Sequence, residues 1–267
     1  MTPPVALSIA GSDSGGCAGI QADLRTFAAY GVLGTTALTS VTAQNGTQVR
    51  SALALPSSLV REQVEAVLDD MPVRAAKTGL LPNEAVVMEV AALAPRLPLL
   101  VVDPVMVATS GQRLADRETV GAYRRHLLPV AAVVTPNLSE AAALLGDRQG
   151  IRDVDHAREA ARRLGEIART VVVKGAPSGD GEVVVDVVWD GEGTWELPNS
   201  RVKSPNTHGS GCTFSAAIAA GLARGLAVRS AIEDANRFVH RAIEGSANWK
   251  FGVGAGPLDH LGWGDRQ

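Results

Sequence analysis

The sequence predicts an α/β fold with a mostly parallel central sheet and helices on both of its faces. Short apolar runs alternate with helical patterns over most of the 267 residues, an order that is typical of parallel sheets. Residues 99–102 and 131–134 are continuously apolar, as expected for strands covered on both faces. No repeat, low-complexity segment or linker divides the chain, so we expect residues 1–267 to form one domain.

The expected elements follow from the spacing of apolar residues and from turn residues. The N-terminal half predicts strands at residues 5–9, 35–41, 51–55 and 73–77, and helices at 19–30, from a cap at Ser57 or Ser58 to 70, and from Pro82 to before Pro95. The remainder predicts strands at 99–102, 131–134, 170–173, 183–189 and 194–197, and helices at 117–128, 155–168, from about 212 to near 225, and 229–247. Asn45-Gly46 and Asp190-Gly191 are hairpin signals.

Composition and charge exclude several classes of protein. Hydrophobic residues make up 46% of the chain, enough for a large core. The net charge of −3 gives no broad basic surface for nucleic acid or an anionic membrane. Cys17 and Cys212 both lie in glycine-rich segments, so a structural disulfide is not expected. The N-terminus lacks the pattern of a signal peptide and no apolar run is long enough to span a membrane. We therefore expect a soluble, cytoplasmic protein.

A glycine-rich turn precedes an alanine-rich helical run at residues 206–222. Gly209 and Gly211 can adopt positive φ and let the backbone approach another group. The first turn of the following helix presents unpaired N–H groups and the positive end of its dipole, which together make an anion hole. A thiol at Cys212 should have a lowered pKa there. On these residues alone, a flexible turn before a buried helix remains an equal alternative.

Polar residues follow the predicted strands, where ligands bind in parallel sheets. Asp103 and Glu140 could hold Mg²⁺, and Lys174 could contact phosphate. Each also has a structural interpretation: Asp103 could end a strand, Lys174 could be solvated, and Asn137 to Glu140 has the spacing of a capping box, which spacing alone favours.

Other candidates are weaker. Asp23 lies on a predicted helix, where a solvated surface charge is the favoured interpretation. Cys17 is interpreted as a small residue that fills space in a loop. The five histidines show no metal-ligand spacing, and His208 has no apparent carboxylate partner to make it a base. The chain contains no P-loop motif.

Taken together, the short motifs resemble the hydroxymethylpyrimidine and phosphomethylpyrimidine kinases of thiamine biosynthesis, within the ribokinase-like superfamily. The motifs stand at residues 10–16, 18–23, 42–45, 77–79, 103–107, 135–140 and 207–213. Their order and joint presence carry the resemblance, which runs nearly from end to end. Two departures stand out: Ser210 replaces the usual threonine, and Leu80 replaces the usual methionine.

The resemblance implies phosphorylation of the hydroxymethyl group by ATP and then of the resulting monophosphate. It assigns the pyrimidine to Gln44, Gly11, Asp23 and Val107; Mg²⁺ to Asp103 and Glu140; the nucleotide to Lys174, Asn137, Thr207, Ser210 and Gly211; and catalysis to Cys212, Lys174, Gly209 and Gly211. Cys212 stands where many relatives carry a catalytic aspartate, and as a thiolate it could accept the proton of the substrate. A homodimer is also implied.

Two alternatives accompany this interpretation. Pyridoxal also carries a hydroxymethyl group on a nitrogen heterocycle, so pyridoxal kinase activity, alone or as a side reaction, is the nearest. A catalytically idle pyrimidine-binding or regulatory module is the other, and the intact set of Asp103, Glu140, Lys174 and the glycine turn argues against it.

Overall fold

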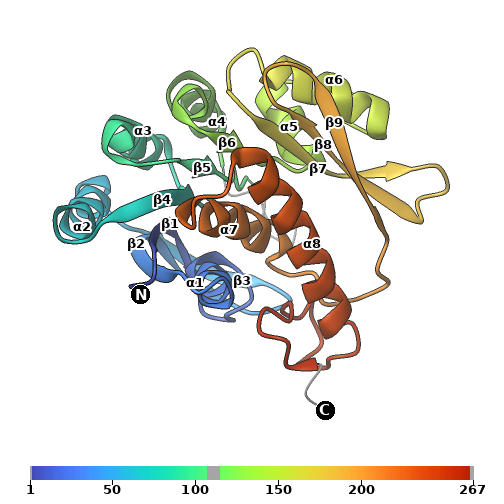
Figure 1. Cartoon of the computed structure of the whole chain (residues 1–267). Helices are drawn as coiled ribbons and strands as arrows, with labels where there is room; N and C mark the ends of the chain where they lie inside the picture. Colours follow the sequence, from blue (N-terminus) through green and yellow to red (C-terminus); the bar gives the residue numbers. More distant parts are fainter. Residues whose placement is uncertain (1, 107–114, 265–267) are drawn as a thin grey trace.

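The computed structural model describes residues 2–106 and 115–264 and shows one sheet between two layers of helices (Figure 1). The strands are β1 (Val5–Asp13), β2 (Leu33–Gln44), β3 (Val49–Ala54), β4 (Val73–Thr78), β5 (Val101–Val102), β6 (Val133–Val134), β7 (Val171–Ser178), β8 (Val183–Trp189) and β9 (Thr194–Ser200). The helices are α1 (Gly19–Ala29), α2 (Ser57–Asp70), α3 (Glu84–Leu93), α4 (Arg117–Ala122), α5 (Leu138–Leu145), α6 (Val154–Leu164), α7 (Ser210–Ala223) and α8 (Val228–Ser246).

The sheet has the order β3-β2-β1-β4-β5-β6-β7-β8-β9. Neighbouring strands from β2 to β7 are parallel, whereas β3 at one edge and β8 and β9 at the other are antiparallel. The sheet is therefore mostly parallel, which confirms the predicted fold class. Both predicted hairpins, β2–β3 and β8–β9, are present.

Each face of the sheet buries its own core. Helices α2 to α6 pack on one face and α1, α7 and α8 on the other. The alternation of side chains along a strand divides them between the two cores: in β1, Leu7 and Ile9 join the first core and Ala6 the second. Val101 and Val102 are divided in the same way, so the apolar runs of the central strands reflect burial on both faces.

Several boundaries differ from the predictions for local reasons. Strand β5 has only two residues, because Leu99 adopts a φ of 43° and is 45% exposed. Helix α2 has Pro56 at its N-cap and no side-chain cap bond, so the predicted serine cap is wrong. Helix α3 begins at Glu84 rather than Pro82, because the Asn83 side chain accepts the N–H of Val86.

Helix α7 crosses the sheet at its centre and places the glycine turn beside the strand ends. It contacts β1, β4 and β5, and every residue from Thr213 to Ala223 is buried. This environment explains its alanine-rich sequence, since larger side chains would not fit between the sheet, α1 and α8. Within the described residues, no helix combines the length and apolar character needed to cross a membrane.

Candidate active site

A cavity of about 660 Å³ opens along the carboxyl ends of the parallel strands, at the N-terminus of α7. The predicted site residues that line it are Gly11, Gln44, Asp103, Asn137, Glu140, Lys174, Thr207, Gly209, Ser210, Gly211 and Cys212. They come from segments more than 200 residues apart in the chain. Val107, predicted to contact the pyrimidine, lies outside the described residues.

The glycine turn is a fixed structure, not a flexible lead-in. Gly209 is the N-cap of α7 with a φ of 85°, and a Cβ there would lie 2.0 Å from the carbonyl oxygen of Cys17. Its own carbonyl accepts hydrogen bonds from the backbone N–H and the hydroxyl of Thr213. The first turn of α7 therefore presents its N–H groups to the cavity from a rigid base, as an anion hole requires.

A cation and a carboxylate stand beside this turn. Lys174 Nζ donates to Asp103 Oδ1 at 3.1 Å, and a Cβ on Gly211 would lie 3.4 Å from the same Nζ. Burial alone would lower the pKa of Lys174, but Asp103 and Glu140 raise it, so the ammonium stays charged. The other oxygen of Asp103 accepts the hydroxyl of Ser215.

Glu140 is both a helix cap and a buried carboxyl in the cavity wall. The predicted capping box is confirmed: Asn137 Oδ1 accepts the N–H of Glu140, and Glu140 Oε2 accepts the N–H of Asn137. Glu140 is only 4% exposed. Burial, together with the nearby charge of Asp103, raises its pKa to about 7. Two neighbouring buried carboxylates repel each other, which is an environment suited to a dication.

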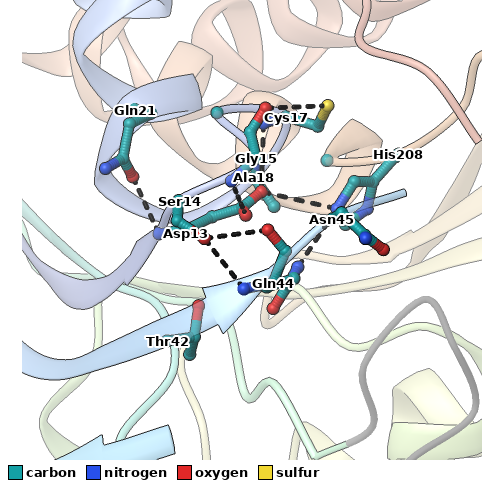
Figure 2. A network of polar contacts seen from close by, with 12 residues as sticks. Asp13, Ser14, Gly15, Cys17, Ala18, Gln21, Thr42, Gln44, Asn45 and His208 are labelled. Atoms are coloured by element: carbon teal, nitrogen blue, oxygen red, sulfur yellow. Dashed lines mark hydrogen bonds and ion pairs between the residues drawn. The ribbon is translucent and has the colours of Figure 1, made fainter. Parts of the chain in front are cut away.

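Gln44 contacts His208, which the sequence did not indicate as a functional residue (Figure 2). Its Nε2 lies 3.2 Å from His208 Nε2, and the same ring nitrogen lies 3.4 Å from Asp13 Oδ2. His208 therefore has a carboxylate partner, contrary to the expectation from sequence. Asp13 lies 195 residues earlier in the chain, so no local spacing could reveal the pair. All three residues line the cavity.

A family model described as phosphomethylpyrimidine kinase matches residues 13–259. The chain belongs to the phosphomethylpyrimidine kinase family. It is 47% identical over 98% of both chains to a hydroxymethylpyrimidine/phosphomethylpyrimidine kinase of Synechococcus elongatus. It is also 44% identical to a chloroplastic thiamine biosynthetic bifunctional enzyme of Arabidopsis thaliana, covering 97% of this chain and 50% of that one. A Bacillus subtilis pyridoxal kinase, solved as an ADP complex, superposes with a TM-score of 0.88 at 37% identity, over 97% of this chain and 98% of that one.

These relatives confirm the resemblance read from the motifs and show that the chain is a kinase. Two of the sequence-based expectations, those for Asp23 and Cys212, differ from the structure.

Asp23 does not line the cavity of this kinase. It is fully buried, and both of its oxygens lie 2.9 Å from Lys77 Nζ, which is also fully buried. The hydroxyl of Ser8 donates to it at 2.6 Å. Asp23 is thus not a solvated surface charge, and it is not among the residues that line the cavity. It holds a buried ion pair beneath the site.

Cys212 does not have the lowered pKa expected at a helix N-terminus. Burial raises the pKa of the thiol to about 11, and the charges of Asp23 and Asp103 add to this. Lys77 and the N–H of Gly19 act in the opposite direction but do not overcome burial. Desolvation is the largest of these contributions and decides the direction of the shift. At pH 7 the resting enzyme therefore carries a thiol.

The cavity wall also contains a series of hydrogen-bonded polar side chains that the sequence does not predict. Asn199 Nδ2 donates to Asn236 Oδ1 at 3.0 Å, Asn236 Nδ2 donates to Asp186 Oδ2 at 3.0 Å, and the N–H of Gly175 donates to Asp186 Oδ1 at 2.8 Å. This series of hydrogen bonds connects β8, β9 and α8 along the cavity wall. Its members occupy ordinary strand and helix positions, so no motif marks them.

Proposed function

We propose that the chain transfers the γ-phosphoryl group of ATP to 4-amino-5-hydroxymethyl-2-methylpyrimidine and then to the resulting monophosphate, in thiamine biosynthesis. The observation that carries this is that one cavity is lined by Gln44 as well as by Lys174 and the N-terminal residues of α7. The names of the relatives support the same substrates. A glutamine offers a donor and an acceptor to a heterocycle edge, while the other groups suit phosphates.

Phosphoryl transfer depends mainly on positioning and on neutralising charge. In our proposal Lys174 contacts the phosphates of ATP, and the N–H groups at Gly209 to Cys212 hold the transferring phosphoryl group. Asn137, Thr207 and Ser210 line the same part of the cavity and complete the nucleotide contacts. The bonds from the N–H and the hydroxyl of Thr213 to the Gly209 carbonyl hold this turn in place, and the N–H of Ser210 donates within the turn to the carbonyl of Thr207 at 3.2 Å.

Mg²⁺ suits the donors that the site provides. Asp103 and Glu140 are buried carboxyls close enough for the charge of one to raise the pKa of the other. In the described parts of the chain, no three His, Cys, Asp or Glu side chains form a metal-binding cluster. This agrees with Mg²⁺, which binds few carboxylates together with water and substrate phosphates. When bound, Mg²⁺ would supply charge neutralisation on the triphosphate.

Cys212 is our candidate for the proton acceptor. With a pKa of about 11, roughly one molecule in 10,000 carries the thiolate at pH 7. That thiolate is scarce, but it is a stronger base toward an alcohol than a thiolate of low pKa. The proposal therefore requires that kcat rise with pH as the thiolate fraction rises, as long as proton transfer from the substrate hydroxyl to the thiolate limits the rate.

We also propose a cytoplasmic homodimer. The exposed apolar residues at the β2–β3 edge favour association: Val41 and Leu53 are direct cross-strand partners and are 44% and 66% exposed. Exposed apolar side chains at the edge of a sheet are a common site of contact between chains. Light scattering of the purified protein tests this directly, and a monomer that persists at high concentration would contradict it.

Pyridoxal kinase activity is the alternative, because the pyridoxal kinase of Bacillus subtilis shares the fold at 37% identity. The test is to compare kcat/KM on hydroxymethylpyrimidine, its monophosphate and pyridoxal with the same enzyme preparation. We expect both pyrimidines to be the better substrates. A pyridoxal kcat/KM above those of both pyrimidines would overturn the proposed function.

A further inference from the structure

The contact between Gln44 and His208 raises a question of hydrogen-bond direction. His208 Nε2 lies 3.2 Å from Gln44 Nε2 and 3.4 Å from Asp13 Oδ2. A neutral imidazole nitrogen has either a proton or a lone pair, so it cannot accept from one neighbour and donate to the other. The two neighbours therefore make opposite demands on this nitrogen: a donating Gln44 amide requires a lone pair there, and a carboxylate favours a proton.

Asp13 is the partner that cannot adapt. Its carboxylate is 4% exposed and accepts backbone N–H groups from Gly15, Cys17 and Ala18 at 2.8 to 3.0 Å. Burial alone would raise the pKa of Asp13, but His208 and the N–H groups of Ala18 and Gly15 hold it below its usual value. An ionised carboxylate only accepts hydrogen bonds, so it favours a proton on His208 Nε2.

Gln44 is the partner that can adapt. Its backbone is fixed, since its N–H donates to Ser14 Oγ and its carbonyl accepts from the same hydroxyl, both at 2.8 Å. Its amide can still turn over by rotation about the terminal bond, which exchanges the oxygen and the nitrogen. The one proton on His208 Nε2 is then shared between Asp13 Oδ2 and the amide, which favours the amide carbonyl oxygen at this contact and turns the amide nitrogen away from it.

We propose that His208, held in its Nε2–H state by Asp13, fixes the orientation of the Gln44 amide and thereby selects the hydrogen-bonding edge of the heterocycle. The inference rests on the proposed function, in which Gln44 contacts the pyrimidine. A 4-aminopyrimidine presents an amino donor beside a ring-nitrogen acceptor, whereas the 4-oxo analogue presents an acceptor beside a ring N–H. The two edges require opposite amide orientations, so fixing the amide rejects one of them.

The kinetic test compares kcat/KM for the 4-amino substrate and its 4-oxo analogue. His208→Phe keeps a flat ring and removes the nitrogen, and we expect the amino-to-oxo preference to fall at least about tenfold. His208→Gln places an amide donor near the position of Nε2 and should keep most of the preference, while the KM for ATP stays unchanged in both variants. His156→Phe is the matched control, because His156 forms an exposed pair with Asp153 on α6.

The outcomes separate the inference from the proposed function. If wild-type enzyme phosphorylates the 4-amino substrate and His208→Phe keeps the wild-type preference, or if the Phe and Gln variants lose it equally, the inference is wrong. If the wild type phosphorylates neither pyrimidine, the proposed function fails. Nitrogen-15 NMR of histidine-labelled protein needs no substrate: we expect Nε2 of His208 to carry the proton, and a bare Nε2 would overturn the inference whatever the substrate.

Discussion

Replacing Glu140 by Gln should change stability with a characteristic dependence on pH. Gln can still accept the N–H of Asn137 from position N3 of α5, so the capping box survives. The substitution therefore removes an ionisable group and little else. Glu140 is 4% exposed, and burial raises its pKa from 4.5 to about 7, so the folded protein holds a proton that the unfolded chain releases between these values.

The sign and size follow from linkage. A raised carboxyl pKa means that wild-type stability falls as pH rises from about 4.5 to 7. At roughly 1.4 kcal/mol per pKa unit, the full penalty is about 3 kcal/mol. Relative to wild type, Glu140→Gln should therefore gain about 2–3 kcal/mol in unfolding free energy between pH 5 and pH 8.5.

Urea unfolding of the nucleotide-free protein at both pH values measures this difference. Glu62→Gln, an exposed carboxyl on α2, is the control and should show no such gain. Adding Mg²⁺ at pH 8.5 should stabilise wild type and not Glu140→Gln, because only the wild type keeps both carboxylates. A pH-independent difference between Glu140→Gln and wild type would refute the reasoning about the buried carboxyl.

Four further predictions test other parts of the site. Gln44→Leu should weaken binding of hydroxymethylpyrimidine by about 1–3 kcal/mol, which raises the KM for this substrate and leaves the KM for ATP unchanged. Unchanged pyrimidine kinetics in a steady-state assay would exclude the contact. In pre-steady-state measurements, the wild-type rate constant of the chemical step should rise about tenfold per pH unit between pH 7 and 9, below the Cys212 pKa of about 11. In Cys212→Ser this rate constant should fall at least about 100-fold and should not depend on pH. A wild-type rate constant that does not depend on pH would exclude the thiolate as the base. Gly209→Ala should abolish activity or folding, since a φ of 85° disfavours a Cβ; circular dichroism distinguishes these, and an active, stable variant would contradict the fixed turn. Asp23→Asn should lower the unfolding free energy by about 3–5 kcal/mol by leaving Lys77 buried and unpaired, and calorimetry showing no loss would mean that the pair is dispensable.

The sequence predicts most of the fold because its signals are local. Apolar runs, the Asn45-Gly46 turn and the capping box at Asn137 each depend on a few adjacent residues, and the structure contains all of them. Boundaries such as the two-residue β5 escaped prediction, because no local pattern marks the positive φ of Leu99. The one-domain prediction stays a prediction.

The sequence predicts which residues line the site, but it does not predict their pKa values or their pairing. The strand-end rule placed Asp103, Glu140 and Lys174 together correctly. It could not give the pKa of Cys212, since burial by residues remote in sequence raises it. Nor could it find the pairing of His208 with Asp13, which only the folded chain brings together.

Product analysis by mass spectrometry tests the central claim most directly. Wild-type protein is incubated with Mg-ATP and hydroxymethylpyrimidine, and the pyrimidine is followed over time. The account predicts that a monophosphate appears first and is converted to a diphosphate, with ADP formed at each step. ATP turnover without phosphorylated pyrimidine, or pyridoxal phosphate as the sole product in a mixture of both substrates, would contradict it.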